Sequence, residues 1–155
     1  MDTISRYVGV GRYKITDVVS GLERSVTLQT PYGHRLWEVL HTTWIDVVSK
    51  PWQIQVDQDT KRITVNKDCL AETEAGTLDL DFVHELIHLK QMTKGVDVFD
   101  RSVSHVNSPT EIEASRVTLE DVKRLGFSQR DMVEYLKGRW ITEDEHRRLV
   151  KAVLD

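Results

Sequence analysis

The string His84-Glu85-Leu86-Ile87-His88 has the form H-E-x-x-H, and the apolar residues around it predict a helix. Residues four apart lie on one face of a helix, so the imidazoles of His84 and His88 could both reach a single metal ion. Zinc is the ion that helical histidine pairs of this spacing commonly hold. Glu85 would lie beside the ion, where its carboxylate could take a proton from a zinc-bound water and pass it to a leaving amine.

A purely structural explanation of this string competes with the metal site. In it, His84 and His88 are hydrogen-bonded core residues, and Glu85 is a surface carboxylate. A random order of the same residues would produce the string in roughly one or two chains per hundred, so the match alone does not decide. Burying these side chains on an otherwise apolar helix costs free energy unless each finds a partner, which a metal would supply. We therefore favour the metal site.

A catalytic zinc site needs a third protein ligand. Cys69 is the only cysteine in the chain, so histidine and carboxylate groups must hold the metal. Glu111 and Glu113 are the nearest carboxylates on a separate predicted helix, and their two-residue offset points them to different sides of it. Glu111 could instead complete a capping box with Ser108, and Glu113 could be a solvated charge.

Together these residues resemble the gluzincin-type zinc metallopeptidases, which pair H-E-x-x-H with a glutamate from a following helix. The similarity extends to small stand-alone members and to ImmA/IrrE-like proteins, in which the third ligand opens a Glu-x-x-Ala-(Asp/Asn) string. Here that string reads Glu111-Ile112-Glu113-Ala114-Ser115, which favours Glu111 over Glu113. Ser115 stands where a carboxylate or amide that braces a ligand histidine is usual. The resemblance covers roughly residues 52–120.

This resemblance implies a zincin-like fold, in which a strand before the active-site helix can pair with an extended peptide. Either Ile54–Val56 or Ile63–Val65 could provide that strand edge. The metzincin pattern is excluded, because Gln91 stands where its glycine belongs and Lys94 where its third histidine belongs.

Apolar periodicity and helix-cap signals predict an α+β fold for one domain, residues 1–155, with a short, partly antiparallel sheet packed on the active-site helix and additional helices. Residues 1–21 are expected to form an irregular or lightly stranded entry rather than a long helix. The expected elements after it are a strand at 22–30, a helix at 34–49, a hairpin of 52–56 with 62–65, and helices at 78–91, 108–126, 128–137 and 142–154.

Other polar residues are weaker candidates for the same site. His105 and Tyr135 could each stabilise an oxyanion, although each could equally be an ordinary loop histidine or a partly buried aromatic residue. Gln91, one turn after His88, could brace the site or merely cap the helix.

Composition narrows the class of protein. The 155-residue chain carries a net charge of −4, which argues weakly against nucleic acid as a main partner. It has neither a run of apolar residues long enough to cross a membrane nor a secretory signal at its start, so we expect a cytoplasmic protein.

These observations predict a zinc-dependent endopeptidase that acts on a peptide or protein substrate, with Glu85 as the catalytic residue and His84, His88 and Glu111 (alternatively Glu113) as the metal ligands. One alternative is a non-catalytic regulatory or interaction protein that retains a zincin fold and a metal site. Another is a DNA-associated regulator that uses the helices between Ser128 and Leu154, for which the acidic net charge predicts no binding to duplex DNA.

Overall fold

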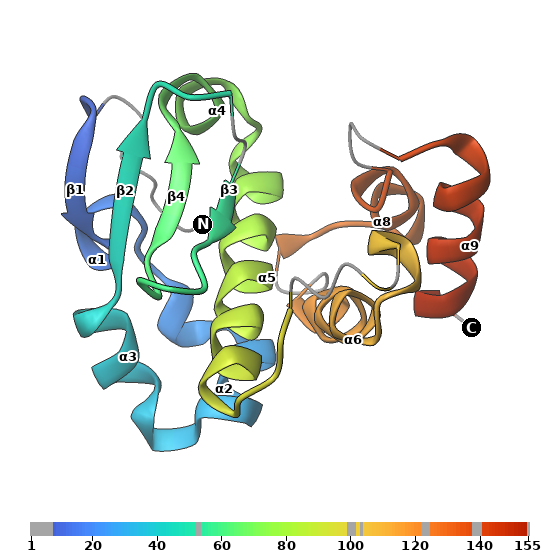
Figure 1. The fold of residues 1–155 in the computed structure, drawn as a ribbon, viewed down its shortest axis with the longest axis horizontal. Helices are drawn as coiled ribbons and strands as arrows, with labels where there is room; N and C mark the ends of the chain where they lie inside the picture. Colours follow the sequence, from blue (N-terminus) through green and yellow to red (C-terminus); the bar gives the residue numbers. More distant parts are fainter. Residues whose placement is uncertain are drawn as a thin grey trace.

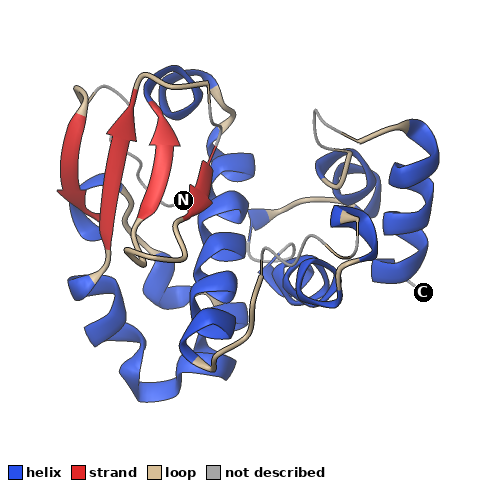
Figure 2. Ribbon diagram, viewed as in Figure 1, coloured by secondary structure: helices blue, strands red, loops and turns tan. Residues whose placement is uncertain are grey.

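The computed structural model describes residues 8–51, 54–98, 102, 104–121, 125–137 and 141–154. Within them, four strands form one mixed sheet in the order β1-β2-β4-β3 (Figure 2). The strands are β1 (Gly11–Lys14), β2 (Trp44–Val48), β3 (Ile54–Val56) and β4 (Ile63–Asn66). β2 and β4 are parallel, whereas β1 pairs antiparallel with β2, and β3 antiparallel with β4. The α+β class and the partly antiparallel sheet are thus confirmed.

The helix α5 (Ala75–Thr93) lies between the sheet and the C-terminal helices, with α2 (Val26–Tyr32) packed against it (Figure 1). Beyond α5 lie α6 (Pro109–Thr118), α8 (Gln129–Tyr135) and α9 (Glu143–Leu154). The remaining elements are α1 (Ile15–Val18), α3 (Leu36–Thr42), α4 (Lys67–Glu72) and the 3-10 turns η1 (Leu22–Arg24), η2 (Gly33–Arg35), η3 (His105–Asn107) and η4 (Leu119–Asp121).

The start of α5 is defined by a side-chain cap. The carboxylate of Glu74 accepts hydrogen bonds from the backbone N–H groups of Gly76 and Thr77, at 3.0 and 2.9 Å. A Cβ at Gly76 would lie only 2.6 Å from the ring of Phe127, so a larger residue at this position would force that ring to move. The helix therefore begins slightly before the predicted 78–91 segment, whose helical structure is confirmed.

Buried apolar side chains occur around much of α5, because the helix packs against other elements on more than one side. Its apolar residues join a core cluster shared with the sheet, α1, α2 and α3. A second, smaller cluster lies beyond it and consists of Val106, Leu136, Leu149 and Val153. This second cluster joins η3 and the end of α8 to α9.

In the N-terminal third, one sequence prediction is wrong and another is wrong in its second half. The predicted strand at 22–30 is mostly helical, because Ser25 caps α2 by accepting a hydrogen bond from the N–H of Leu28 at 3.1 Å. The predicted helix at 34–49 ends at Thr42 and is followed by β2. Ile45 and Val47 are buried between the neighbours of β2, so pairing on both edges overrides the helical spacing.

Other expected elements are confirmed with shifted ends. β3 and β4 form the predicted antiparallel hairpin, although the start of its first strand at residues 52–53 lies outside the described residues. α6 begins after Ser108 as predicted and gives way to η4 after Thr118, while residues 122–124 of the predicted helix lie outside the described residues. α8 and α9 occupy the two predicted C-terminal segments. Among the described helices, none combines the length and apolar character needed to cross a lipid bilayer.

Candidate metal centre

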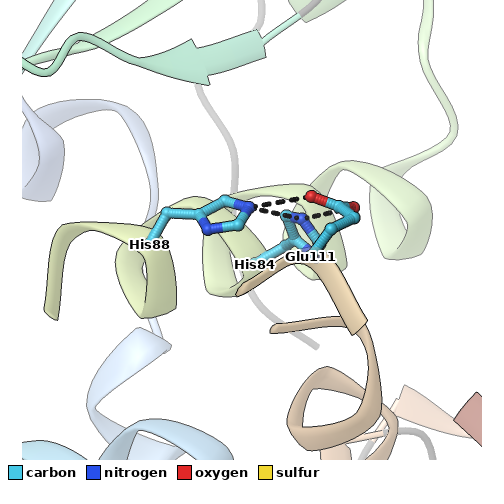
Figure 3. A group of neighbouring side chains, drawn as sticks. All are labelled: His84, His88 and Glu111. Carbon is cyan, nitrogen blue, oxygen red and sulfur yellow. Dashed lines mark hydrogen bonds and ion pairs between the residues drawn. The ribbon is translucent and has the colours of Figure 1, made fainter. Parts of the chain in front are cut away.

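Three donor side chains converge where α5 faces the start of α6 (Figure 3). The Nε2 atoms of His84 and His88 are 3.0 Å apart. The carboxylate of Glu111 bridges them, with Oε1 lying 3.1 Å from Nε2 of His84 and Oε2 lying 3.0 Å from Nε2 of His88. One donor atom from each residue lies within 4.8 Å of the other two, so the three could hold one metal ion.

The backbone explains why these particular side chains meet. His84 and His88 lie one turn apart on α5, and Glu111 lies in the first turn of α6, after Pro109 at the helix start. Ser108 makes no side-chain cap in α6, so Glu111 is not half of a capping box. Glu111 is only 9% exposed, whereas Glu113 is exposed and lies outside the three-donor group.

The charges of the cluster are coupled. Burial alone would raise the pKa of Glu111, but the positive charge of His84 and hydrogen bonds from His105, His84 and His88 hold it well below its usual range. Burial alone would lower the pKa of His84, but the Glu111 carboxylate outweighs it and raises this pKa to about 9. At neutral pH the proton held by His84 therefore balances the negative charge of Glu111. A divalent cation would displace that proton on binding.

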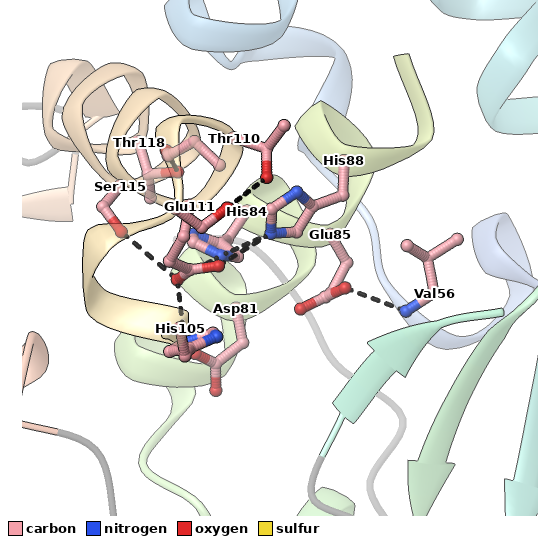
Figure 4. A network of polar contacts seen from close by, with 12 residues as sticks. Val56, Asp81, His84, Glu85, His88, His105, Thr110, Glu111, Ser115 and Thr118 are labelled. Atoms are coloured by element: carbon pink, nitrogen blue, oxygen red, sulfur yellow. Dashed lines mark hydrogen bonds and ion pairs between the residues drawn. The ribbon is translucent and has the colours of Figure 1, made fainter. Parts of the chain in front are cut away.

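Glu85 occupies the strip of α5 next to this cluster and reaches toward the sheet (Figure 4). Its Oε2 accepts a hydrogen bond from the backbone N–H of Val56 in β3, at 2.8 Å. Burial raises the pKa of Glu85, against the lowering influence of the two nearby histidines. The result is a carboxylate of fixed orientation and increased basicity beside the three donors.

The donor set fits a transition-metal cation of the zinc type. Two imidazole nitrogens and one carboxylate oxygen are usual ligands of catalytic zinc, which keeps its fourth position for water or substrate. Nδ1 of His88 lies 2.8 Å from Oε1 of Gln91, which leaves Nε2 to face the cluster. Nδ1 of His84 is buried and has no hydrogen-bond partner among the described residues. The His84 ring therefore lacks the kind of orienting hydrogen bond that His88 makes with Gln91.

A cleft of about 640 Å³ opens over the donors, and two of the three weaker candidates from the sequence, His105 and Tyr135, contribute to its lining. Nε2 of His105 lies 3.4 Å from Oε1 of Glu111, and the His105 side chain is 61% exposed. The hydroxyl of Tyr135 donates to Asp81 at 2.9 Å, and burial raises the pKa of Asp81 to about 7. The remaining wall is mostly apolar, formed by Pro51, Ile54, Val98, Leu136, Ile141 and Leu149.

Two participants in this site were not singled out from the sequence. Asp81 precedes His84 by three residues, a helical spacing that could have placed it on the same face as the motif. The backbone donor of Val56 carries no side-chain signal, and only the placement of β3 against α5 reveals it.

The chain matches no protein-family model, and no curated protein or solved structure shows significant similarity to it. The interpretation of the site therefore depends on its own chemistry.

Proposed function

We propose that this chain is a zinc-dependent endopeptidase of the gluzincin type, with a zincin-like fold, that cleaves peptide or protein substrates. The observation that carries the proposal is the position of Glu85 beside the His84, His88 and Glu111 donors, in one cleft. A structural metal site needs only its ligands, whereas a hydrolytic site also needs a base next to the metal. Glu85 supplies that base.

The chemical roles follow from the placement of the side chains. A zinc ion held by the three donors would polarise the peptide carbonyl and make water more acidic. Glu85 takes the proton of the attacking water and later gives it to the departing amine. The Val56 N–H holds Oε2 of Glu85, so the carboxylate does not have to be oriented when substrate binds.

The sheet offers an edge for an extended substrate. β3 is an edge strand and β4 lies inside the sheet, so of the two segments expected to pair with a peptide, Ile54–Val56 has the free edge. Main-chain groups alternate in direction along a strand, and the N–H of Val56 points to Glu85. The N–H and C=O of Ile54 therefore face the same side, where a peptide strand could pair with them.

A second candidate function is a non-catalytic regulatory protein with a closed metal site. The observation in its favour is His105, whose Nε2 lies close enough to Glu111 to become a fourth ligand after a small movement. Four protein ligands would leave no position for water or substrate. The high exposure of His105 favours the open, catalytic arrangement.

The test combines metal content with peptide cleavage. We expect one zinc per chain in the wild type by elemental analysis, and much less in His84→Ala. Glu85→Gln should retain zinc and lose at least about 100-fold in cleavage of a peptide library, the usual effect of removing a general base. His41→Ala, which changes an exposed histidine on α3, is the matched control and should behave as wild type.

His105→Ala separates the two candidate functions. Unchanged zinc content and affinity would indicate an open site, whereas loss of zinc would identify His105 as a fourth ligand and favour the regulatory protein. Wild-type protein that binds no zinc even after zinc is added, or Glu85→Gln that cleaves as fast as wild type, would contradict the peptidase.

A further inference from the structure

The side chain of Gln91 contacts both helices that carry the metal-site donors. Gln91 is 6% exposed and lies on α5, one turn after His88. Its Oε1 lies 2.8 Å from Nδ1 of His88. Its Nε2 donates to the backbone carbonyl of Thr110 at 3.1 Å and approaches Oε1 of Glu113 at 3.4 Å. Thr110 is the residue immediately before Glu111.

These contacts determine which way the Gln91 amide points. A carbonyl and a carboxylate can only accept hydrogen bonds, so the amide nitrogen must face Thr110 and Glu113. The amide oxygen is then left to face His88, and because it can only accept, Nδ1 of His88 must carry a hydrogen. Nε2 of that ring is consequently the nitrogen that binds a cation.

Capping of the α5 end does not explain these contacts. At that end, the backbone carbonyl of Gln91 accepts from the N–H groups of Lys94 and Val96, each at 3.1 Å. The side-chain amide takes no part in this and is directed at the metal site instead. Ser115, where the family pattern would place a brace, makes only a 3.5 Å contact with Glu111.

We propose that Gln91 is the positioning residue that pre-forms the metal site. It fixes the tautomer and orientation of the His88 ring and ties the start of α6, and so Glu111, to α5. This inference rests on the metal centre of the proposed function, but it does not require that the protein cleaves peptides.

The test compares two Gln91 variants with a control of similar burial. Gln91→Leu removes both the acceptor for His88 and the donor to Thr110. Gln91→Glu keeps an acceptor for His88 and removes the donor to Thr110. Thr118→Val is the control, because its fully buried hydroxyl bonds only to Ala114 within α6. Zinc dissociation constants come from competition with a chromophoric chelator. The hydrogen on Nδ1 of His88 is detected by ¹⁵N NMR of metal-free protein, in which Nε2 of the same ring faces Glu111.

Gln91→Leu should weaken zinc binding by about 10–100-fold, the usual effect of losing an outer partner of a ligand histidine. Its His88 ring should also lose the preference for hydrogen on Nδ1. Gln91→Glu should retain that preference and bind zinc with intermediate affinity. Thr118→Val should lower the melting temperature without changing zinc affinity.

Two results would overturn the inference: Gln91→Leu that binds zinc as tightly as wild type, or an unchanged His88 tautomer in that variant. If Gln91→Leu does not fold, Gln91→Glu decides, since wild-type zinc affinity there would show that the Thr110 contact has no role. A wild type without zinc would refute the proposed function. The NMR measurement would still show whether Gln91 keeps a hydrogen on Nδ1 of His88.

Discussion

Glu111 and Glu113 are two residues apart on α6, and this offset places only Glu111 against the histidines. We expect Glu111→Ala to weaken zinc binding by more than the roughly 10–100-fold typical of outer-partner loss, because a ligand itself is removed. Glu113→Ala removes only a 3.4 Å contact with Gln91 and should bind zinc nearly as the wild type does. Titration of metal-free protein with zinc measures both.

Circular dichroism of the two metal-free variants is the control, since a loss of fold would also reduce zinc binding. If folded Glu113→Ala lost zinc while folded Glu111→Ala retained it, the assignment of the third donor would be wrong.

Residues that carry their own chemical signal could be predicted from the sequence. The spacing of His84 and His88 was sufficient to expect two donors. The family resemblance favoured Glu111 over Glu113 as the third, and the structure brings His84, His88 and Glu111 together. The contact between Glu85 and Val56 could not be predicted, because a backbone N–H has no sequence signature. It depends on how closely the edge strand approaches α5.

Two ion pairs to one aspartate connect the strands of the sheet. Asp46 on β2 accepts hydrogen bonds from Arg12 on β1 and from Arg62, the residue just before β4, each at 2.8 Å. Burial alone would raise the pKa of Asp46, but the two guanidinium groups outweigh it and lower this pKa. Asp46 thereby links three neighbouring strands on the partly exposed face of the sheet.

Asp46→Asn should therefore lower the free energy of unfolding by about 1 kcal/mol at pH 7, a value limited by solvent screening of the arginines. Because the pKa of Asp46 is lower in the folded than in the unfolded chain, its contribution is present above the unfolded value of about 3.9 and is lost as the pH falls through the folded pKa. The wild-type advantage should thus shrink below about pH 4. Urea unfolding of both proteins across pH 3–7 measures it.

Asp59→Asn, in the exposed loop between β3 and β4, is the control for general charge effects and should change stability little. An advantage of wild type over Asp46→Asn that stays constant down to pH 3 would show that the ion pairs are not its source.

The sequence predicted helices correctly where an apolar pattern of helical spacing was long or a helix-cap residue preceded it. The long apolar pattern around the motif predicted α5, and the cap signal at Thr142 precedes α9. The prediction failed around Val26 and Trp44, where short segments carry apolar residues at spacings that fit either a helix or a strand. At β2 the outcome was decided by pairing with β1 and β4, which lie far away in the sequence.

On the scale of the whole molecule, the cleft joins two halves of the chain. Ile54 of β3 and Pro51, in the segment between β2 and β3, contribute to one wall, and the second apolar cluster contributes Leu136 and Leu149 to the other. Sequence patterns identified the amphipathic C-terminal helices but not the direction of their apolar side chains. Packing of η3 and α6 against α9 sets that direction.

If the chain is the proposed peptidase, the lining of this cleft predicts which substrate side chains it would accept. No lysine or arginine occurs among the described lining residues, which include the carboxylates of Asp81, Glu85, Glu111 and Glu145 beside the apolar wall. An acidic substrate side chain would lose hydration there without gaining a cation other than the metal, whereas an apolar side chain would be buried favourably. We expect peptides with leucine next to the cleaved bond to exceed those with aspartate by about 10–100-fold in kcat/KM.

Glu145 allows the charge component of this preference to be measured alone. Its Oε1 accepts from the N–H of Thr142 at the start of α9, and Glu145→Gln keeps that acceptor while removing the charge. The variant should cleave aspartate peptides several-fold better, since one repulsive charge is gone, and leucine peptides as well as wild type. Glu143→Gln, an exposed change in the same turn, should alter neither. Equal cleavage of leucine and aspartate peptides by the wild type would mean that substrates do not lie along this wall, and their path would then have to leave the cleft on the β3 side alone.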